Sequence, residues 1–224
     1  MRTPDSWHTA RATVAIALLT VFIHLVLSVM GWQQQALLWG AFFPPDGDLL
    51  SLINDELGFP RAPFVLTPLT AALLHAGMLH LLFNMLVFVF CGRAVEGALG
   101  PVNLIILYVV GAFAAAAGQY GADQLNSGLP RPMIGASGAV SAVIGAYAML
   151  FGKNRVRVSD SRLALWLNVA WLMAAWVGLQ VAVAIVLSAS VDGGILLAVG
   201  AHIGGFVAGV LLARPLLLWR YRKA

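Results

Sequence analysis

A serine and a histidine, each placed in an otherwise apolar segment, are the residues most able to do chemistry. Ser137 follows Gly135 and Ala136 near the start of one apolar segment, and His202 lies within the last such segment. A serine hydroxyl becomes a nucleophile when an adjacent base takes its proton, and histidine is the usual base. We therefore interpret Ser137 as a candidate nucleophile and His202 as its candidate general base.

Polar residues that lie deep within apolar segments are costly, so each requires a reason. There are nine: His24, His75, His80, Asn84, Ser137, Ser141, Asn168, Gln180 and His202. Depth is measured from the first basic residue beyond the inner end of each segment, at about 1.5 Å rise per residue. Ser137 then lies at roughly 24 Å, His80 at roughly 20 Å, His202 at roughly 18 Å and Asn84 at roughly 14 Å. Because the first three lie at similar depth on three segments, we expect them to share one site.

Hydrogen-bond donors for a developing oxyanion are available near the serine. His80 and Asn84 are four residues apart and project from one face of a helix, so both can donate to negative charge. Ser137 lies in the first turn of its segment, where backbone N–H groups are free and the helix dipole is positive. His75 lies about 140° around the helix from His80, which suits a structural hydrogen bond better. No Asp or Glu lies within the apolar segments, which favours a Ser-His dyad over a triad.

Six apolar segments must hold these residues. Of the 224 residues, 61% are hydrophobic and only 10% are charged, so lipid rather than water is the expected solvent. Each segment approaches the ~20 residues that cross a bilayer, and a backbone in lipid must satisfy its own hydrogen bonds, so we expect helices. The alternating segments of a β-barrel, each about ten residues long, do not occur. The predicted fold is an all-α membrane protein, a bundle of six transmembrane helices at residues 14–30, 69–90, 102–118, 135–151, 163–188 and 195–213.

The basic residues assign the orientation of this bundle. With the N-terminus inside, eleven Lys and Arg residues fall on cytoplasmic segments and two fall outside, so both termini are expected in the cytoplasm. The domains are then a cytoplasmic tail at 1–13, a membrane domain at 14–213 with a long outer loop at 31–68, and a basic cytoplasmic tail at 214–224. The aromatic residues and prolines of the loop indicate that it lies in the membrane interface. A cleaved signal peptide is the alternative for the first segment, but its apolar run is too long and no A-x-A site follows.

The fourth segment, 135–151, is short. Its 17 residues span roughly 25 Å, less than the ~30 Å hydrocarbon core, so its outer end should stop below the lipid surface and leave a recess for water. Small residues, including Gly138, form one face of this segment, and Gly205 and Gly209 share a face of the last segment with His202. A Gly-x-x-x-Gly pair lets helix backbones approach closely, so packing of the two faces can bring the imidazole to the serine.

In their order and spacing these residues resemble the rhomboid family of intramembrane serine proteases. Three motifs on three different segments carry the resemblance: His75, His80 and Asn84 in the second, Gly135-Ala136-Ser137-Gly138 opening the fourth, and Ala201-His202 with Gly205 and Gly209 in the sixth. Residues 92–96, which follow the second segment, also resemble the inner loop of the family. The resemblance extends from about residue 60 to residue 213.

The resemblance implies a serine endopeptidase with Ser137 as nucleophile and His202 as general base. It implies an oxyanion hole formed by His80, Asn84 and the backbone N–H of Ser137 or Ala136. The other members of the motifs would be structural support: His75, Gly135, Gly138, Gly205 and Gly209. The substrate would be the transmembrane helix of another protein, entering sideways near spans two and five and cut where it unwinds. No metal, cofactor or nucleic acid is implied, and we expect a monomer in a bacterial inner membrane.

Two positions depart from the family pattern. The family often has Trp-Arg in its first loop, where this chain has Leu66 and Thr67. Many members have an aromatic residue one helical turn after the serine, packing under the catalytic histidine, and here that residue is Ser141. The first departure removes the usual anchor of the loop. The second leaves His202 less rigidly held, which would lower activity without abolishing it.

Two other functions stay open for the same residues. A rhomboid-like protein that binds membrane helices without cutting them would lack the serine or the histidine, and both are present. A transporter or proton channel could use His75, His80 and His202, but intramembrane acids or a repeated half would be expected. A metal site on those histidines would lack carboxylate or thiolate ligands. The tryptophans of span five are interpreted as packing or lipid-facing residues: Trp166, Trp171 and Trp176.

Overall fold

The described structure is helical. The computed structural model describes residues 10–44, 47–58, 60–125, 132–152, 160–188 and 198–222. Its helices are α1 (Arg11–Met30), α2 (Gln33–Gly40), α3 (Gly47–Leu57), the 3-10 turn η2 (Phe64–Leu66), α4 (Thr67–Ala71), α5 (Met78–Leu99), α6 (Pro101–Gln124), α7 (Ser137–Phe151), α8 (Ser161–Ser188) and α9 (Val199–Tyr221). One isolated β-bridge is the only strand-like pairing among these residues. The predicted all-α architecture is confirmed.

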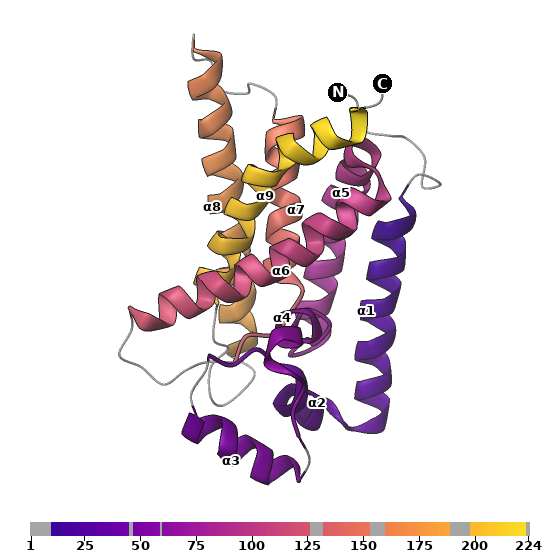
Figure 1. The fold of residues 1–224 in the computed structure, drawn as a ribbon, viewed down its shortest axis with the longest axis vertical. Coiled ribbons are helices and arrows are strands. Elements are labelled where there is room, and N and C mark those ends of the chain that lie inside the picture. The colour runs from indigo at the N-terminus through magenta and orange to yellow at the C-terminus, as the bar shows by residue number, and fades with distance from the viewer. Residues whose placement is uncertain are drawn as a thin grey trace.

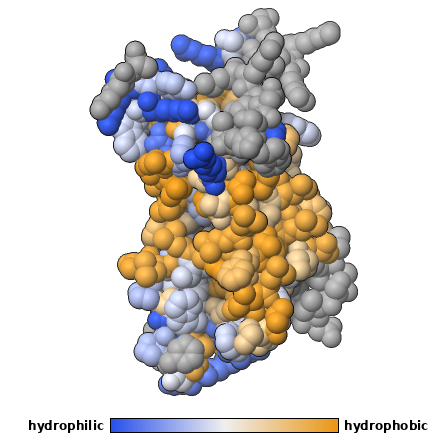
Figure 2. Space-filling model, turned by 90° about the vertical axis from the view of Figure 1, so that its right-hand side faces the viewer, coloured by the Kyte–Doolittle hydropathy of each residue, from blue (hydrophilic) through white to orange (hydrophobic). Residues whose placement is uncertain are grey.

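The lengths and surfaces of these helices are those of an integral membrane protein. Five of the described helices are long and apolar enough to cross a bilayer: α1, α5, α6, α9 and, over Ser161–Ala182, α8. α7 is also apolar but has 15 residues, so the sixth span stays a prediction. Phe22 on α1 and Phe90 on α5 are 64% and 62% exposed. Figure 2 shows an apolar band across the middle of one face, with hydrophilic residues above and below it.

Helix α7 forms the centre of the bundle and packs against α5, α6, α8 and α9 (Figure 1). Every residue from 137 to 146 is buried. α9 approaches α7 so closely that a Cβ on Gly205 would overlap the carbonyl oxygen of Gly138, and a Cβ on Gly209 would overlap that of Ala142. Glycine at these two positions allows the backbones to touch, as small residues do between membrane helices.

A buried carboxylate joins the beginning of α1 to the end of α5. Glu96 is 1% exposed, and its carboxylate accepts hydrogen bonds from the backbone N–H groups of Ala12 at 2.9 Å and Thr13 at 2.7 Å. These N–H groups belong to the first turn of α1, where no intrahelical partner exists. Arg220, at the end of α9, donates to the carbonyl oxygen of Gly97 at 2.6 Å. The start of α1 and the ends of α5 and α9 therefore lie together, at the top of Figure 1.

The interpretation of residues 92–96 as an inner loop is wrong, because these residues continue α5 to Leu99. Gly92, Ala94 and Val95 are buried, and the charge of Glu96 is satisfied by α1. Arg93 therefore ends the apolar pattern but does not end the helix.

The second predicted segment, 69–90, is not one continuous helix. α4 ends at Ala71 and α5 begins at Met78, and His75 lies in the break between them. The carbonyl oxygen of Ala71 accepts a hydrogen bond from Gly135 N–H at 2.9 Å, which connects this break to the segment preceding α7. The helical angle predicted between His75 and His80 is therefore wrong, and their ring centroids lie 5.1 Å apart.

The predicted outer loop at 31–68 contains α2, α3 and η2. Arg61 holds it together: Nε donates to the carbonyl oxygen of Leu38 at 2.7 Å and Nη2 donates to that of Ala41 at 2.8 Å. Its guanidinium also lies 4.6 Å from the ring centroid of Phe43. Arg61 thus fixes the loop although the Trp-Arg pair of the family pattern is absent.

The same loop contacts the segment that precedes α7. Phe42 and Met133 exchange two backbone hydrogen bonds, of 3.1 and 2.8 Å. Thr70 of α4 donates its hydroxyl to the carbonyl oxygen of Gly40 at 2.6 Å. The loop, α4 and the entry to α7 therefore form one connected unit around the first turn of α7.

Candidate active site

The hydroxyl of Ser137 and the imidazole of His202 lie in direct contact. Ser137 Oγ and His202 Nε2 are 2.9 Å apart, and the two residues are 6% and 3% exposed. Ser137 is the first residue of α7 and His202 lies in the first turn of α9. A serine and a base within hydrogen-bond reach are what nucleophilic catalysis requires.

Gly135 shapes the backbone immediately before the serine. Its φ of +108° is a conformation that residues with a side chain rarely adopt. A Cβ placed there would lie 2.9 Å from His80 Nε2 and 3.7 Å from Ser137 Oγ. His80 and Ser137 therefore flank the same glycine, and the absence of a side chain keeps the space between them open.

His80 and Asn84 occupy one face of α5 beside this glycine. Asn84 is fully buried, and its Nδ2 donates to the backbone carbonyl oxygen of His80 at 3.0 Å. Its Oδ1 is buried without a hydrogen-bond partner among the described residues. Nδ2 carries a second N–H, so Asn84 has a donor to offer a ligand while it keeps the contact with His80.

The backbone N–H of Ala136 already has a partner. It donates to His75 Nε2 at 3.4 Å, and His75 is itself buried. His75 therefore makes a hydrogen bond to the segment preceding α7, from a position outside any helix. To donate to an oxyanion, the N–H of Ala136 would have to break its hydrogen bond to His75. The first N–H groups of α7, beginning with that of Ser137, have no acceptor within their own helix.

The described surroundings of His202 include no carboxylate contact. His202 Nδ1 has no hydrogen-bond partner among the described residues, and the carboxylate of Glu96 is occupied by α1. In the same part of the chain, no group of three His, Cys, Asp or Glu residues is arranged to hold a metal ion. Among the described residues, the contact between Ser137 and His202 is therefore made without a carboxylate on Nδ1.

Trp176 is the neighbour of His202 that the sequence reading missed. Its ring centroid lies 6.2 Å from that of His202 at an interplanar angle of 66°, and its Nε1 donates to Ser141 Oγ at 2.7 Å. Ser141 in turn donates to the carbonyl oxygen of Ser137 at 2.6 Å. The available signal was Ser141, whose buried hydroxyl donates to the backbone of its own helix and can still accept a hydrogen bond from a neighbouring helix.

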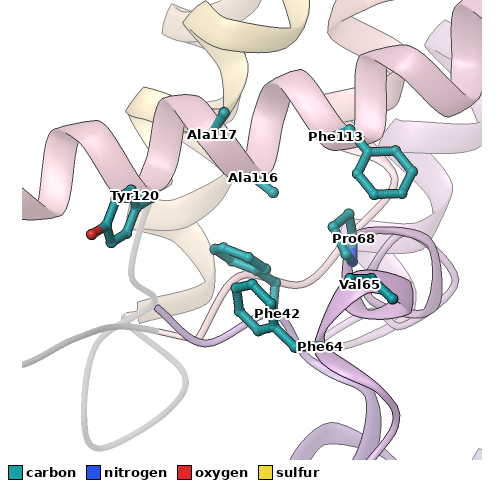
Figure 3. Close-up of a pocket in the computed structure, with 8 residues that line it drawn as sticks. All are labelled: Phe42, Phe64, Val65, Pro68, Phe113, Ala116, Ala117 and Tyr120. Carbon is teal, nitrogen blue, oxygen red and sulfur yellow. The ribbon is translucent and has the colours of Figure 1, made fainter. Parts of the chain in front are cut away.

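Two cavities lie near the site without being lined by its serine. A cavity of about 200 Å³ is bounded by α1, α2 and the break before α5, and its mostly apolar walls also include the polar residues His24, Gln34 and His75. A larger apolar cavity of about 400 Å³ lies between α6 and the outer loop (Figure 3), lined by Phe42, Phe64, Val65, Pro68, Phe113, Ala116, Ala117 and Tyr120. The first offers polar groups to water close to His75, and the second offers none of the residues considered for catalysis.

Comparison with known proteins gives one family and several bacterial relatives. A family model described as the Rhomboid domain matches residues 65–219. The chain is 25% identical over 203 residues to the Rhomboid protease GlpG of Pectobacterium atrosepticum, covering 90% of this chain and 61% of the relative. It is 28% identical over 176 residues to the protein of the same name from Enterobacter sp., with coverages of 74% and 56%. For that of Yersinia pestis the identity is 30% over 144 residues, with coverages of 63% and 45%. The chain thus spans less than two thirds of the length of these relatives.

Proposed function

This chain belongs to the rhomboid family, and on that premise we propose that it is a serine endopeptidase that cuts other membrane proteins within the bilayer. Ser137 is the nucleophile and His202 is the general base. The observation that carries the proposal is the 2.9 Å contact between Ser137 Oγ and His202 Nε2 in a buried setting. The relatives named Rhomboid protease GlpG support the same reaction class.

In the first half of the reaction, Ser137 Oγ attacks the carbonyl carbon of the scissile peptide bond while its proton passes to His202 Nε2. The carbonyl oxygen becomes an oxyanion. As the tetrahedral intermediate collapses, the C–N bond breaks and His202 gives its proton to the leaving amine. In the second half, His202 takes a proton from water, the resulting hydroxide attacks the acyl-enzyme, and the proton returns to Ser137 Oγ.

His80, Asn84 and a backbone N–H stabilise the oxyanion. His80 and Ser137 flank Gly135, so a carbonyl oxygen near this glycine lies within reach of the His80 imidazole. Asn84 has an N–H on Nδ2 beyond the one it gives to His80. Of the two backbone candidates, Ser137 N–H is favoured over Ala136 N–H, because the latter donates to His75. Donors of this type act on charge that develops only in the transition state.

The membrane arrangement completes the proposal. Helices α1, α5, α6, α7, α8 and α9 form a six-span bundle with both termini in the cytoplasm, and α7 stops short of the outer surface. The chain divides into a tail at 1–13, a membrane domain at 14–213 with its outer loop at 31–68, and a basic tail at 214–224. The substrate is a transmembrane helix that enters from the lipid near α5 and α8. The enzyme acts as a monomer in a bacterial inner membrane, in keeping with the bacterial relatives.

The proposal is tested by reconstituting the protein into liposomes with single-span test proteins and following their cleavage. We expect a cleaved product from the wild type and none from Ser137→Ala at equal folded amounts, checked by thermal unfolding. Product formation by Ser137→Ala at the wild-type rate would remove this serine from the reaction.

A further inference from the structure

One tryptophan of α8 faces inward, unlike its neighbours. Trp176 is 4% exposed, whereas Trp166 is 54% and Trp171 is 71% exposed on the same helix. An indole buried at membrane depth requires an acceptor for its N–H, and Trp176 finds it in Ser141 Oγ at 2.7 Å. The sequence interpretation of Trp176 as a packing or lipid-facing residue therefore overlooks a specific polar contact.

Ser141 connects this indole to the nucleophile. Its hydroxyl accepts from Trp176 Nε1 and donates to the backbone carbonyl oxygen of Ser137 at 2.6 Å. Both partners of Ser141 are buried. The hydroxyl therefore both accepts and donates a hydrogen bond, and it holds the indole beside the first turn of α7.

The same indole packs against the imidazole of His202. The rings of Trp176 and His202 meet edge to face, with centroids 6.2 Å apart. His202 Nε2 is hydrogen-bonded to Ser137 Oγ, and His202 Nδ1 has no hydrogen-bond partner among the described residues. Packing against Trp176 therefore supplies the orientation that a carboxylate on Nδ1 supplies in a triad.

We propose that Trp176 is a positioning residue for His202, held in place by Ser141, so that the alignment of the dyad depends on α8 being packed against α7. The proposal rests on the proposed protease function. In the family pattern, an aromatic residue one helical turn after the serine supports the histidine, and Ser141 occupies that position here. The proposal assigns this support to Trp176 of α8 instead. Without the indole beside it, the imidazole of His202 is free to rotate away from Ser137.

The test compares variants that break the contact with one that does not. Trp176→Phe keeps a ring beside His202 but removes the N–H, Ser141→Ala removes the acceptor, and the double variant removes both. Trp171→Phe is the matched control on the lipid-facing side of α8. We measure kcat and KM for cleavage of a single-span protein, and the rate at which a fluorophosphonate labels Ser137, which needs an aligned dyad but no substrate helix.

We expect Trp176→Phe and Ser141→Ala each to lower kcat and the labelling rate by about 10- to 100-fold with KM unchanged. The double variant should be no slower than the slower single variant, because both substitutions remove one contact. Trp171→Phe should match the wild type in the rate of fluorophosphonate labelling, which needs no substrate helix. Wild-type kcat and labelling rates in both Trp176→Phe and Ser141→Ala would overturn the positioning role and leave the protease standing, as would a change in KM alone. A wild type that neither labels nor cleaves would overturn both proposals.

Discussion

Thr13 of α1 gives both its backbone N–H and its hydroxyl to one oxygen of the Glu96 carboxylate, each at 2.7 Å. The other carboxylate oxygen accepts from Ala12 N–H at 2.9 Å. A side chain from the end of α5 thus caps the first turn of α1, a role usually filled by a residue at the helix's own start. The first span is thereby joined to the helix that carries His80 and Asn84.

We predict that Glu96→Gln destabilises the protein by about 1–3 kcal/mol, because an amide offers a single acceptor oxygen and leaves a buried N–H of α1 unsatisfied. Thermal unfolding in detergent measures the effect. Glu56→Gln on α3 is the control, since Glu56 is exposed. Equal unfolding temperatures for the two variants would contradict the capping role.

The close approach of α9 to α7 predicts that Gly209→Ala lowers both stability and cleavage. The new methyl group would overlap the carbonyl oxygen of Ala142, so α9 must move and take His202 from Ser137. We expect a loss of about 1–3 kcal/mol of stability and at least about 10-fold in kcat. Gly178→Ala on α8 is the control, because a Cβ there meets nothing within 4 Å and a helical alanine is favoured over glycine. Wild-type behaviour of Gly209→Ala would contradict the contact.

Gly135→Ala should lower the rate of fluorophosphonate labelling by at least about 10-fold, because a methyl group would collide with His80 beside the serine. Gly31→Ala separates this effect from backbone strain. Gly31 also has a positive φ, of 70°, but a Cβ there meets nothing within 4 Å. Both variants should lose about 1–2 kcal/mol of stability, and only Gly135→Ala should lose reactivity. Loss of reactivity in both would show that strain alone explains it.

Asn84→Ala should lower kcat by about one to three orders of magnitude with KM nearly unchanged, as removal of a single oxyanion donor does. Asn103→Ala is the control, because Asn103 is buried and donates to the carbonyl oxygen of Leu216, away from the residues proposed for catalysis. An unchanged kcat in Asn84→Ala would remove this residue from the oxyanion hole.

The helical membrane architecture and the principal site candidates could be predicted from the sequence because each polar residue at membrane depth stands out against apolar neighbours. Ser137 and His202 stood out as candidates in this way, and their chemistry and motifs distinguished them from the other polar residues at membrane depth. The shortness of α7 was also visible, since the apolar run ends where the helix does.

Features set by tertiary contacts were not predictable. The break between α4 and α5, which contains His75, is followed by residues as apolar as those of any helix, so hydropathy does not reveal it. The hydrogen bond from Gly135 N–H to the carbonyl oxygen of Ala71 accompanies this break. The extension of α5 past Arg93 depends on buried partners for Glu96, which lie 83 and 84 residues away in sequence. The inward direction of Trp176 depends on the rotation of α8 about its axis, which a helix that is apolar on all faces does not reveal.

The most direct test of the central claim is labelling by a fluorophosphonate, which reacts with a serine only when a base activates it. Intact mass and peptide mapping of the purified protein should show one adduct, on Ser137, in the wild type and none in Ser137→Ala or His202→Ala. Equal labelling of all three proteins, or an adduct on a different residue, would contradict the assignment of Ser137 and His202 as a catalytic pair.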